Sequence, residues 1–145
     1  STEKNSSWKK HPTMTAIGIF CRILIDGKFD NDSLEQRIGI ENLINDLPKW
    51  NEKEIDFYYW YFSMEVLSCF EGEVEKYTSS KYIRSLKELL TRNQKTLADN
   101  CANGSWDTVG VDKWGYEGGR VYGTAMNVLT LEVFYRYGNI SWEKK

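Results

Sequence analysis

A joint between two predicted helices, in the last third of the chain, favours an array of helical hairpins. Gln94 ends the first helix, the turn Gly104-Ser105-Trp106 follows, and Gly118-Gly119 leads into the second helix. The Trp106 ring can stack against the polar side chain of Gln94 and tie the two helix ends together. The paired glycines allow backbone angles that other residues avoid. Because the joint supplies no catalytic group, it indicates an architecture and not a chemistry.

Helical periodicity extends over most of the chain. Pro12 suits the first turn of a helix, Asp32 or Ser33 can cap a second one, and Leu47-Pro48 ends it. No stretch shows the alternation of a strand, so we predict an all-α fold of five to six helices. The five clearest helices are expected over residues 12–24, 34–47, 54–70, 79–94 and 119–137.

The helices are expected to form one domain, because 145 residues suffice for a single sizeable core. We assign this domain to residues 12–140, between a polar leader at 1–11 and a polar tail at 141–145. The first, third and fifth helices are broadly apolar, whereas the second and fourth have one apolar stripe, so buried helices should alternate with exposed ones. Matching residues around Thr15, Ser63 and Thr124 indicate a repeat of one helical hairpin.

The charge of the chain gives no reason to expect nucleic acid as a partner. The formal net charge is −2, from 19 basic and 21 acidic residues, and the pI is about 5.5. No run approaches the roughly 18 apolar residues of a membrane span. Residues 1–5 lack the apolar segment of a signal peptide, although a chain that begins with Ser is compatible with a fragment of a longer protein.

The cysteines indicate neither a disulfide framework nor a metal site. Cys21, Cys69 and Cys101 are odd in number, form no CxxC pair and have only His11 as a histidine partner. We expect three buried free thiols, which weakly favour a reducing compartment. No cofactor and no metal are predicted.

Several motifs resemble the repeat of the α/α toroid superfamily, which includes squalene and hopene cyclases and the protein prenyltransferase β subunits. The pair Leu89-Leu90, Gln94 and the Gly104-Ser105-Trp106 turn resemble the cyclase-type joint, with a longer interval before Gly104. The aromatic run 56–62 and the segment 118–137 are similar to a cyclase-like repeat domain of uncharacterised, largely planctomycete-type bacterial proteins. The resemblance covers residues 12–137 and implies helical hairpin repeats that form a sector of an α/α toroid.

The catalytic groups of those families are not matched. Cyclases protonate their substrate with a D-x-D-D motif, and Asp30-Asn31-Asp32-Ser33 lacks its last acid and reads better as a turn and cap. The zinc site of a prenyltransferase would need a histidine on an inner helix, and His11 lies in the leader. We therefore predict no catalytic residue and no metal ligand in this chain.

The run from Phe57 to Phe62 is the best candidate for a binding surface, because six successive helical positions project to every side and cannot all enter one core. The candidate binding tyrosines are Tyr58, Tyr59, Tyr61 and, from the last helix, Tyr122. The alternative is a close-packed inner helix whose tyrosine hydroxyls are hydrogen-bonded to neighbours.

Charged residues near this run have two interpretations each. Asp56 is either a helix cap, which we favour, or part of a site. Arg120 either grips an anion at a helix N-terminus or pairs with Asp107, Asp112 or Glu117 and locks the long loop, which we favour. Glu65 and Glu132 lie in helices predicted to be buried, so they need partners, for which Arg22, Arg120 and Arg136 are available.

Five or six helices make only a sector of a ring. The inner face must then be covered by self-association, by the remainder of a larger parent protein or by collapse into a compact bundle. We expect a noncatalytic repeat module that binds a protein segment or an apolar ligand through an aromatic inner face. The alternative is part of a terpene cyclase-like or polysaccharide-lyase-like enzyme whose catalytic residues lie outside this chain.

Overall fold

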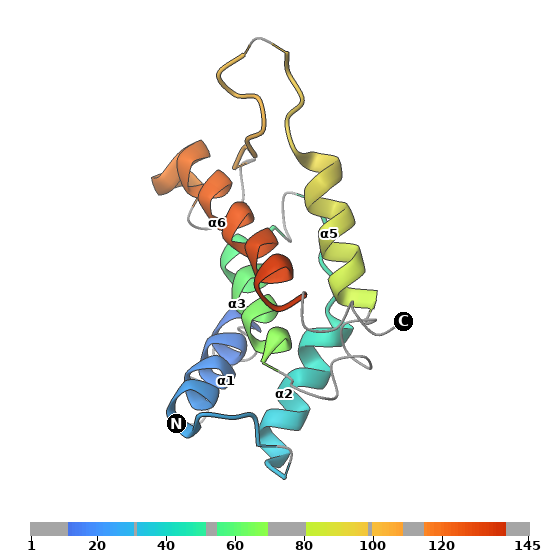
Figure 1. Ribbon diagram of the computed structural model, residues 1–145, viewed down its shortest axis with the longest axis vertical. Coiled ribbons are helices and arrows are strands. Elements are labelled where there is room, and N and C mark those ends of the chain that lie inside the picture. Colours follow the sequence, from blue (N-terminus) through green and yellow to red (C-terminus); the bar gives the residue numbers. More distant parts are fainter. Residues whose placement is uncertain are drawn as a thin grey trace, which may run out of the picture.

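The computed structural model describes residues 12–30, 32–51, 55–69, 81–98, 100–108 and 115–138. The described residues form five α-helices and no strand, which confirms the predicted all-α class (Figure 1). The predicted leader at 1–11, the tail at 141–145, the helix ends at 54, 70 and 79, and Asp112 lie outside the described residues. The helices are α1 (Pro12–Asp26), α2 (Leu34–Asn45), α3 (Phe57–Ser68), α5 (Lys81–Asn93) and α6 (Gly115–Gly138).

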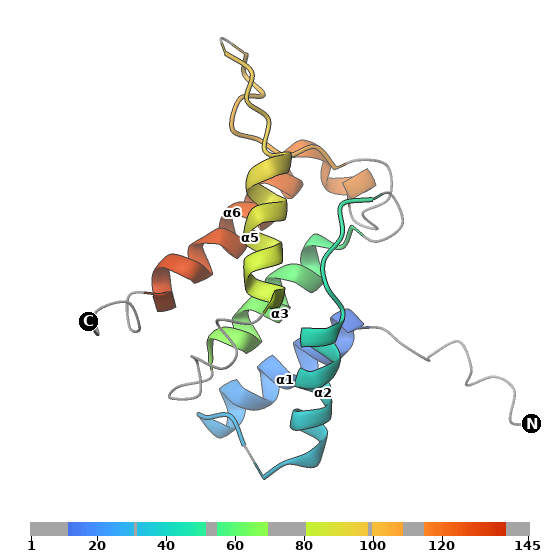
Figure 2. The same ribbon diagram turned by 90° about the vertical axis from the view of Figure 1, so that its right-hand side faces the viewer.

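The helices are arranged in two layers. One layer contains α1, α3 and α6, with α3 in the middle and in contact with both of the others. Figure 2 shows that these three helices run in the same direction, whereas α2 and α5 run in the opposite direction in a second layer. In that second layer α2 contacts both α1 and α5. The described helices, taken in chain order, therefore alternate between the layers, as an array of helical hairpins requires.

Local capping determines where two helices begin. The Ser33 side chain accepts a hydrogen bond of 3.4 Å from the Gln36 N–H and caps α2, as one of the two predicted candidates. The Asp56 side chain accepts a bond of 2.8 Å from the Tyr59 N–H, so α3 begins at Phe57 and not at the predicted residue 54. In each case the cap satisfies a backbone donor that has no partner inside the helix.

Three other predicted helix limits differ from the structure by two residues or more. α1 ends at Asp26, two residues after the predicted end at 24. α2 ends at Asn45, two residues before the predicted end at 47. α6 begins at Gly115 and contains a break at Gly119, whose φ of 56° and ψ of −155° are not helical. The predicted start at 119 therefore marks the break between a short first turn and the long helix, because glycine tolerates this backbone conformation.

The core is built around α3, whose largest buried side chains include Phe57, Trp60 and Leu67. The amphipathic α5 adds the buried stripe Tyr82, Leu86 and Leu90 to the same core, as its sequence predicts.

The expected burial of the first and fifth predicted helices is wrong for a large part of their surface. α1 buries only Ala16, Ile19 and Ile23, and its Ile25 is 80% exposed. α6 leaves Val121 and Tyr135 mostly exposed. These helices lie at the two ends of their layer, so each has a neighbour on one side only among the described elements.

Two further expectations of burial fail. Cys21 of α1 and Cys101 of the loop between α5 and α6 are exposed and only Cys69 is half-buried, although all three are free thiols as predicted. Glu132 is exposed as well, and it pairs with Arg136 one helical turn away at 2.7 Å.

Within the part of the chain that the structure describes, no helix is long and apolar enough to cross a membrane.

Candidate functional site

Aromatic rings from three helices gather on one side of the α1–α3–α6 layer. Phe62 of α3 lies 6.0 Å from Phe20 of α1, 5.8 Å from Tyr58 and 5.1 Å from Tyr61, measured between ring centroids. Tyr58 in turn stacks against Tyr122 of α6, with a centroid distance of 6.1 Å and an interplanar angle of 20°. We call these five side chains the aromatic face. It contains three of the predicted binding residues, Tyr58, Tyr61 and Tyr122.

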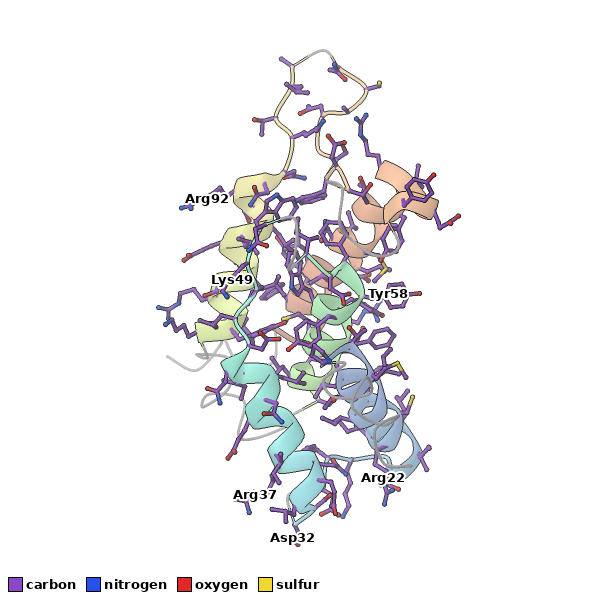
Figure 3. All side chains as sticks on the ribbon, turned by 180° about the vertical axis from the view of Figure 1, so that it is seen from behind. Arg22, Asp32, Arg37, Lys49, Tyr58 and Arg92 are labelled. Carbon is purple, nitrogen blue, oxygen red and sulfur yellow. The ribbon has the colours of Figure 1, made fainter. Side chains whose placement is uncertain are left out.

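The aromatic face is partly accessible to solvent. Tyr58 is 37% exposed, and the other four residues are half-buried. Figure 3 shows Tyr58 pointing outward on the side of the molecule opposite to Arg92 of α5. Such rings offer large apolar area together with polarised π faces and hydroxyl groups.

The structure places the fourth predicted tyrosine elsewhere. Tyr59 is 4% exposed and lies in the core near Tyr82 of α5. Burial raises the pKa of both phenols, and the Ser63 hydroxyl nearby partly offsets that rise. Within the described residues the hydroxyls of Tyr59, Ser63 and Tyr82 have no hydrogen-bond partner of good geometry. Tyr59 therefore belongs to the packing between the layers and not to the aromatic face.

A carboxylate lies beside the rings. Positions 58, 61, 62 and 65 follow the spacing of one helix face, so the Glu65 side chain is on the same side of α3 as the aromatic face. Burial and the hydrogen bond to the Glu65 carboxylate raise the pKa of the Tyr61 phenol to about 12, and Arg136 opposes that rise. Tyr61 is thus a neutral donor at physiological pH.

Asp56 is a helix cap. Besides the bond from the Tyr59 N–H, it accepts a hydrogen bond of 2.7 Å from the Thr13 hydroxyl of α1. Its two carboxylate oxygens therefore hold the start of α3 and join it to α1. This geometry agrees with the capping interpretation of Asp56. Each of its two carboxylate oxygens accepts one of these structural hydrogen bonds.

Arg120 holds the long loop before α6. Its Nε donates to the Asp107 carboxylate at 2.6 Å, and the Lys95 ammonium pairs with the same carboxylate. Hydrogen bonds from Lys95 and then Arg120 lower the pKa of Asp107 below its ordinary value. Of the two predicted partners among the described residues, Asp107 and Glu117, the structure pairs Arg120 with Asp107.

The predicted joint ties the end of α5 to α6 through hydrogen bonds. The Gln94 amide donates to the Gly104 carbonyl at 2.9 Å, and the Trp106 indole donates to the Leu90 carbonyl at 2.8 Å. Gly104 has a φ of +78°, a value that favours glycine. The Lys95 N–H donates to the Ser105 carbonyl at 2.8 Å, and the Gly104 N–H donates to the Lys95 carbonyl at 2.8 Å. The loop between Lys95 and Gly104 projects from the molecule (Figure 1).

Two participants were not predicted from the sequence. Phe20 joins the aromatic face, and Lys95 joins the Asp107 ion pair. Phe20 is the one aromatic residue of α1, but its contact with Phe62 could not be predicted because it depends on the approach of α3. Lys95 directly follows Gln94 at the start of the loop. This position in the sequence could have indicated a cation close to Asp107 at the end of the loop.

The described residues contain no group of three or more His, Cys, Asp or Glu side chains that could hold a metal ion. A hollow of about 330 Å³ lies between α1 and the start of α2 and contains none of the predicted binding residues. In comparisons with known proteins, no protein-family model, no curated protein and no solved structure matches this chain. The support for the aromatic face as a candidate site is therefore its geometry alone.

Proposed function

We propose that this chain is a noncatalytic repeat module of the α/α toroid kind, and that it binds an apolar protein segment through the aromatic face. The observation that carries the proposal is the stacking of the partly exposed Tyr58 against Tyr122, beside Phe62. Solvent-accessible aromatic rings that meet from neighbouring helices are typical of interaction surfaces, where tyrosine contributes much binding energy.

Two features support binding over catalysis. Asp56, for which a part in a site was the less favoured interpretation, is engaged in capping bonds, and Arg120 is engaged with Asp107. The rings, by contrast, belong to regular helices, which hold side chains more rigidly than loops do. A preorganised surface of this kind loses little conformational entropy when a partner binds.

The proposal is tested by selecting a displayed library of short random peptides on the immobilised chain. Selected peptides should bind Tyr58→Arg at least about tenfold more weakly than the wild type, because the substitution places a charge in the middle of the face. The matched control is Tyr116→Arg, since Tyr116 is 95% exposed in the first turn of α6, outside the face.

Circular dichroism and thermal unfolding of both variants establish that the fold is retained. Native mass spectrometry of the wild type then separates a peptide site from self-association and from a retained apolar molecule. Peptides that bind the wild type and Tyr58→Arg equally well would refute the proposal, as would a failure to select any peptide.

A further inference from the structure

Glu65 is an unusual residue to find at the aromatic face. Its side chain belongs to the middle of α3 and is only 5% exposed. Among the described residues no basic side chain forms an ion pair with Glu65. Arg22 pairs with Asp26, and Arg136, whose charge acts on the neighbouring Tyr61 phenol, pairs with Glu132. A nearly buried carboxylate without a directly bound cation is costly, because it loses its hydration and a more distant charge compensates only part of that loss.

The neighbours of Glu65 suit a cation. Tyr61 and Phe62 are four and three residues before it on the same helix, so their rings are adjacent to its carboxylate. The two rings meet edge to face, with centroids 5.1 Å apart. An ammonium or guanidinium group at the carboxylate would therefore also contact the negative faces of these rings. The Tyr61 hydroxyl occupies only part of the accepting capacity of the carboxylate.

The same surface suits the stem of a long basic side chain. Tyr58 and Phe62 lie 5.8 Å apart and form an apolar path that leads along α3 towards Glu65. Lysine and arginine place their methylene groups on such surfaces while the charged end reaches an acceptor. A bound metal ion fits less well, because a single carboxylate provides too few ligands.

We propose that the partner of the aromatic face is a protein segment with a lysine or arginine among apolar residues, and that Glu65 anchors its cationic group. This inference rests on the proposed function and adds the charge of the partner. Glu65 acts here as a specificity-determining residue, whereas Tyr58 and Phe62 supply apolar contact.

The experiment repeats the random-peptide selection on the wild type, Glu65→Gln and Glu88→Gln. Glu88 is an exposed carboxylate of α5, in the other layer, and serves as the matched control. Peptides selected by the wild type and by Glu88→Gln should share a lysine or arginine at a fixed position, and those selected by Glu65→Gln should not.

A double-mutant cycle with one synthetic selected peptide gives the decisive measurement. Glu65→Gln should weaken binding of this peptide at least about tenfold, because a desolvated charge pair is lost. When the basic residue of that peptide is replaced by Met, Glu65→Gln should have little effect on the binding affinity. Thermal unfolding of the free chain should be unchanged or occur at a higher temperature in Glu65→Gln, because a costly buried charge is removed.

The outcomes separate this inference from the proposed function. If peptides bind in a Tyr58-dependent way but show no basic residue, or if Glu65→Gln has no effect on them, Glu65 is not the anchor and the proposed function stands. If no peptide depends on Tyr58, both fail. A marked loss of thermal stability in Glu65→Gln, with equal weakening of both peptides, would mean that Glu65 is structural.

Discussion

The indole N–H of Trp106 donates a hydrogen bond of 2.8 Å to the backbone carbonyl of Leu90, near the C-terminal end of α5. Trp106 is almost fully buried, and its own backbone N–H donates to the Thr124 hydroxyl of α6 at 3.3 Å. One residue thus satisfies a carbonyl at the end of one helix and contacts the next helix. The position of α6 beside α3, and with it the place of Tyr122 in the aromatic face, depends on this joint.

Replacing Trp106 by Phe should lower the free energy of unfolding by about 1–3 kcal/mol, because the Leu90 carbonyl loses a buried donor while most ring contacts remain. Urea unfolding measures the change. Trp50→Phe is the control, because Trp50 also packs its ring against other rings, those of Phe57 and Trp60, and the substitution removes the same ring volume. Equal losses in the two variants would show that ring volume, and not the Leu90 bond, explains the effect.

Two glycine substitutions should act in opposite directions. Gly104→Ala should destabilise the chain by about 1–2 kcal/mol, because its φ of +78° is unfavourable for a residue with a Cβ. Gly18→Ala should stabilise it by about 0.5–1 kcal/mol, because Gly18 is helical and an added Cβ meets no atom within 4 Å. Thermal unfolding of both variants tests the pair. A stabilising Gly104→Ala would contradict the left-handed conformation of that residue.

The Asp107 ion pairs should make part of the stability depend on pH. Lys95 and Arg120 lower the pKa of this carboxyl in the folded chain, so its contribution is present above the ordinary value of 3.8 and is lost as the pH falls through the lowered pKa. Because the site is solvent-exposed, the contribution should be below about 1 kcal/mol. Urea unfolding of the wild type and Asp107→Asn from neutral to acidic pH measures it. A difference that grows as the pH falls below 3.8 would contradict the assignment.

Asp56→Ala should lower the free energy of unfolding by about 0.5–2 kcal/mol, because the Tyr59 N–H and the Thr13 hydroxyl both lose an acceptor. Asp56→Asn should retain most of the stability, since asparagine is also a good cap. Binding of the peptides selected on the wild type should be unchanged in Asp56→Asn. Loss of that binding without loss of stability would instead make Asp56 a part of the site.

Several features could be predicted from the sequence because they depend on residues near one another in the chain. The single stripe of α5 with Tyr82, Leu86 and Leu90, and the cap formed by Asp56, follow from helical periodicity and from the needs of a helix N-terminus. The pairing of Arg120 with Asp107 was one of three predicted options, and the structure shows this pair because the fold brings the start of α6 beside the loop. The limits of α2 and α6 were less predictable, because glycine and loop residues permit several local conformations.

The sequence by itself determined that this is a helical protein, where most of its helices lie, and that residues 57–62 are too aromatic to fit one core. Only the tertiary structure decided which of those rings remain accessible. Tyr59 turns towards Tyr82 between the layers, whereas Tyr58 reaches Tyr122 and Phe62 reaches Phe20. The physical reason is that a helix presents successive residues in every direction, so burial is determined by the neighbours that the other helices bring against each side.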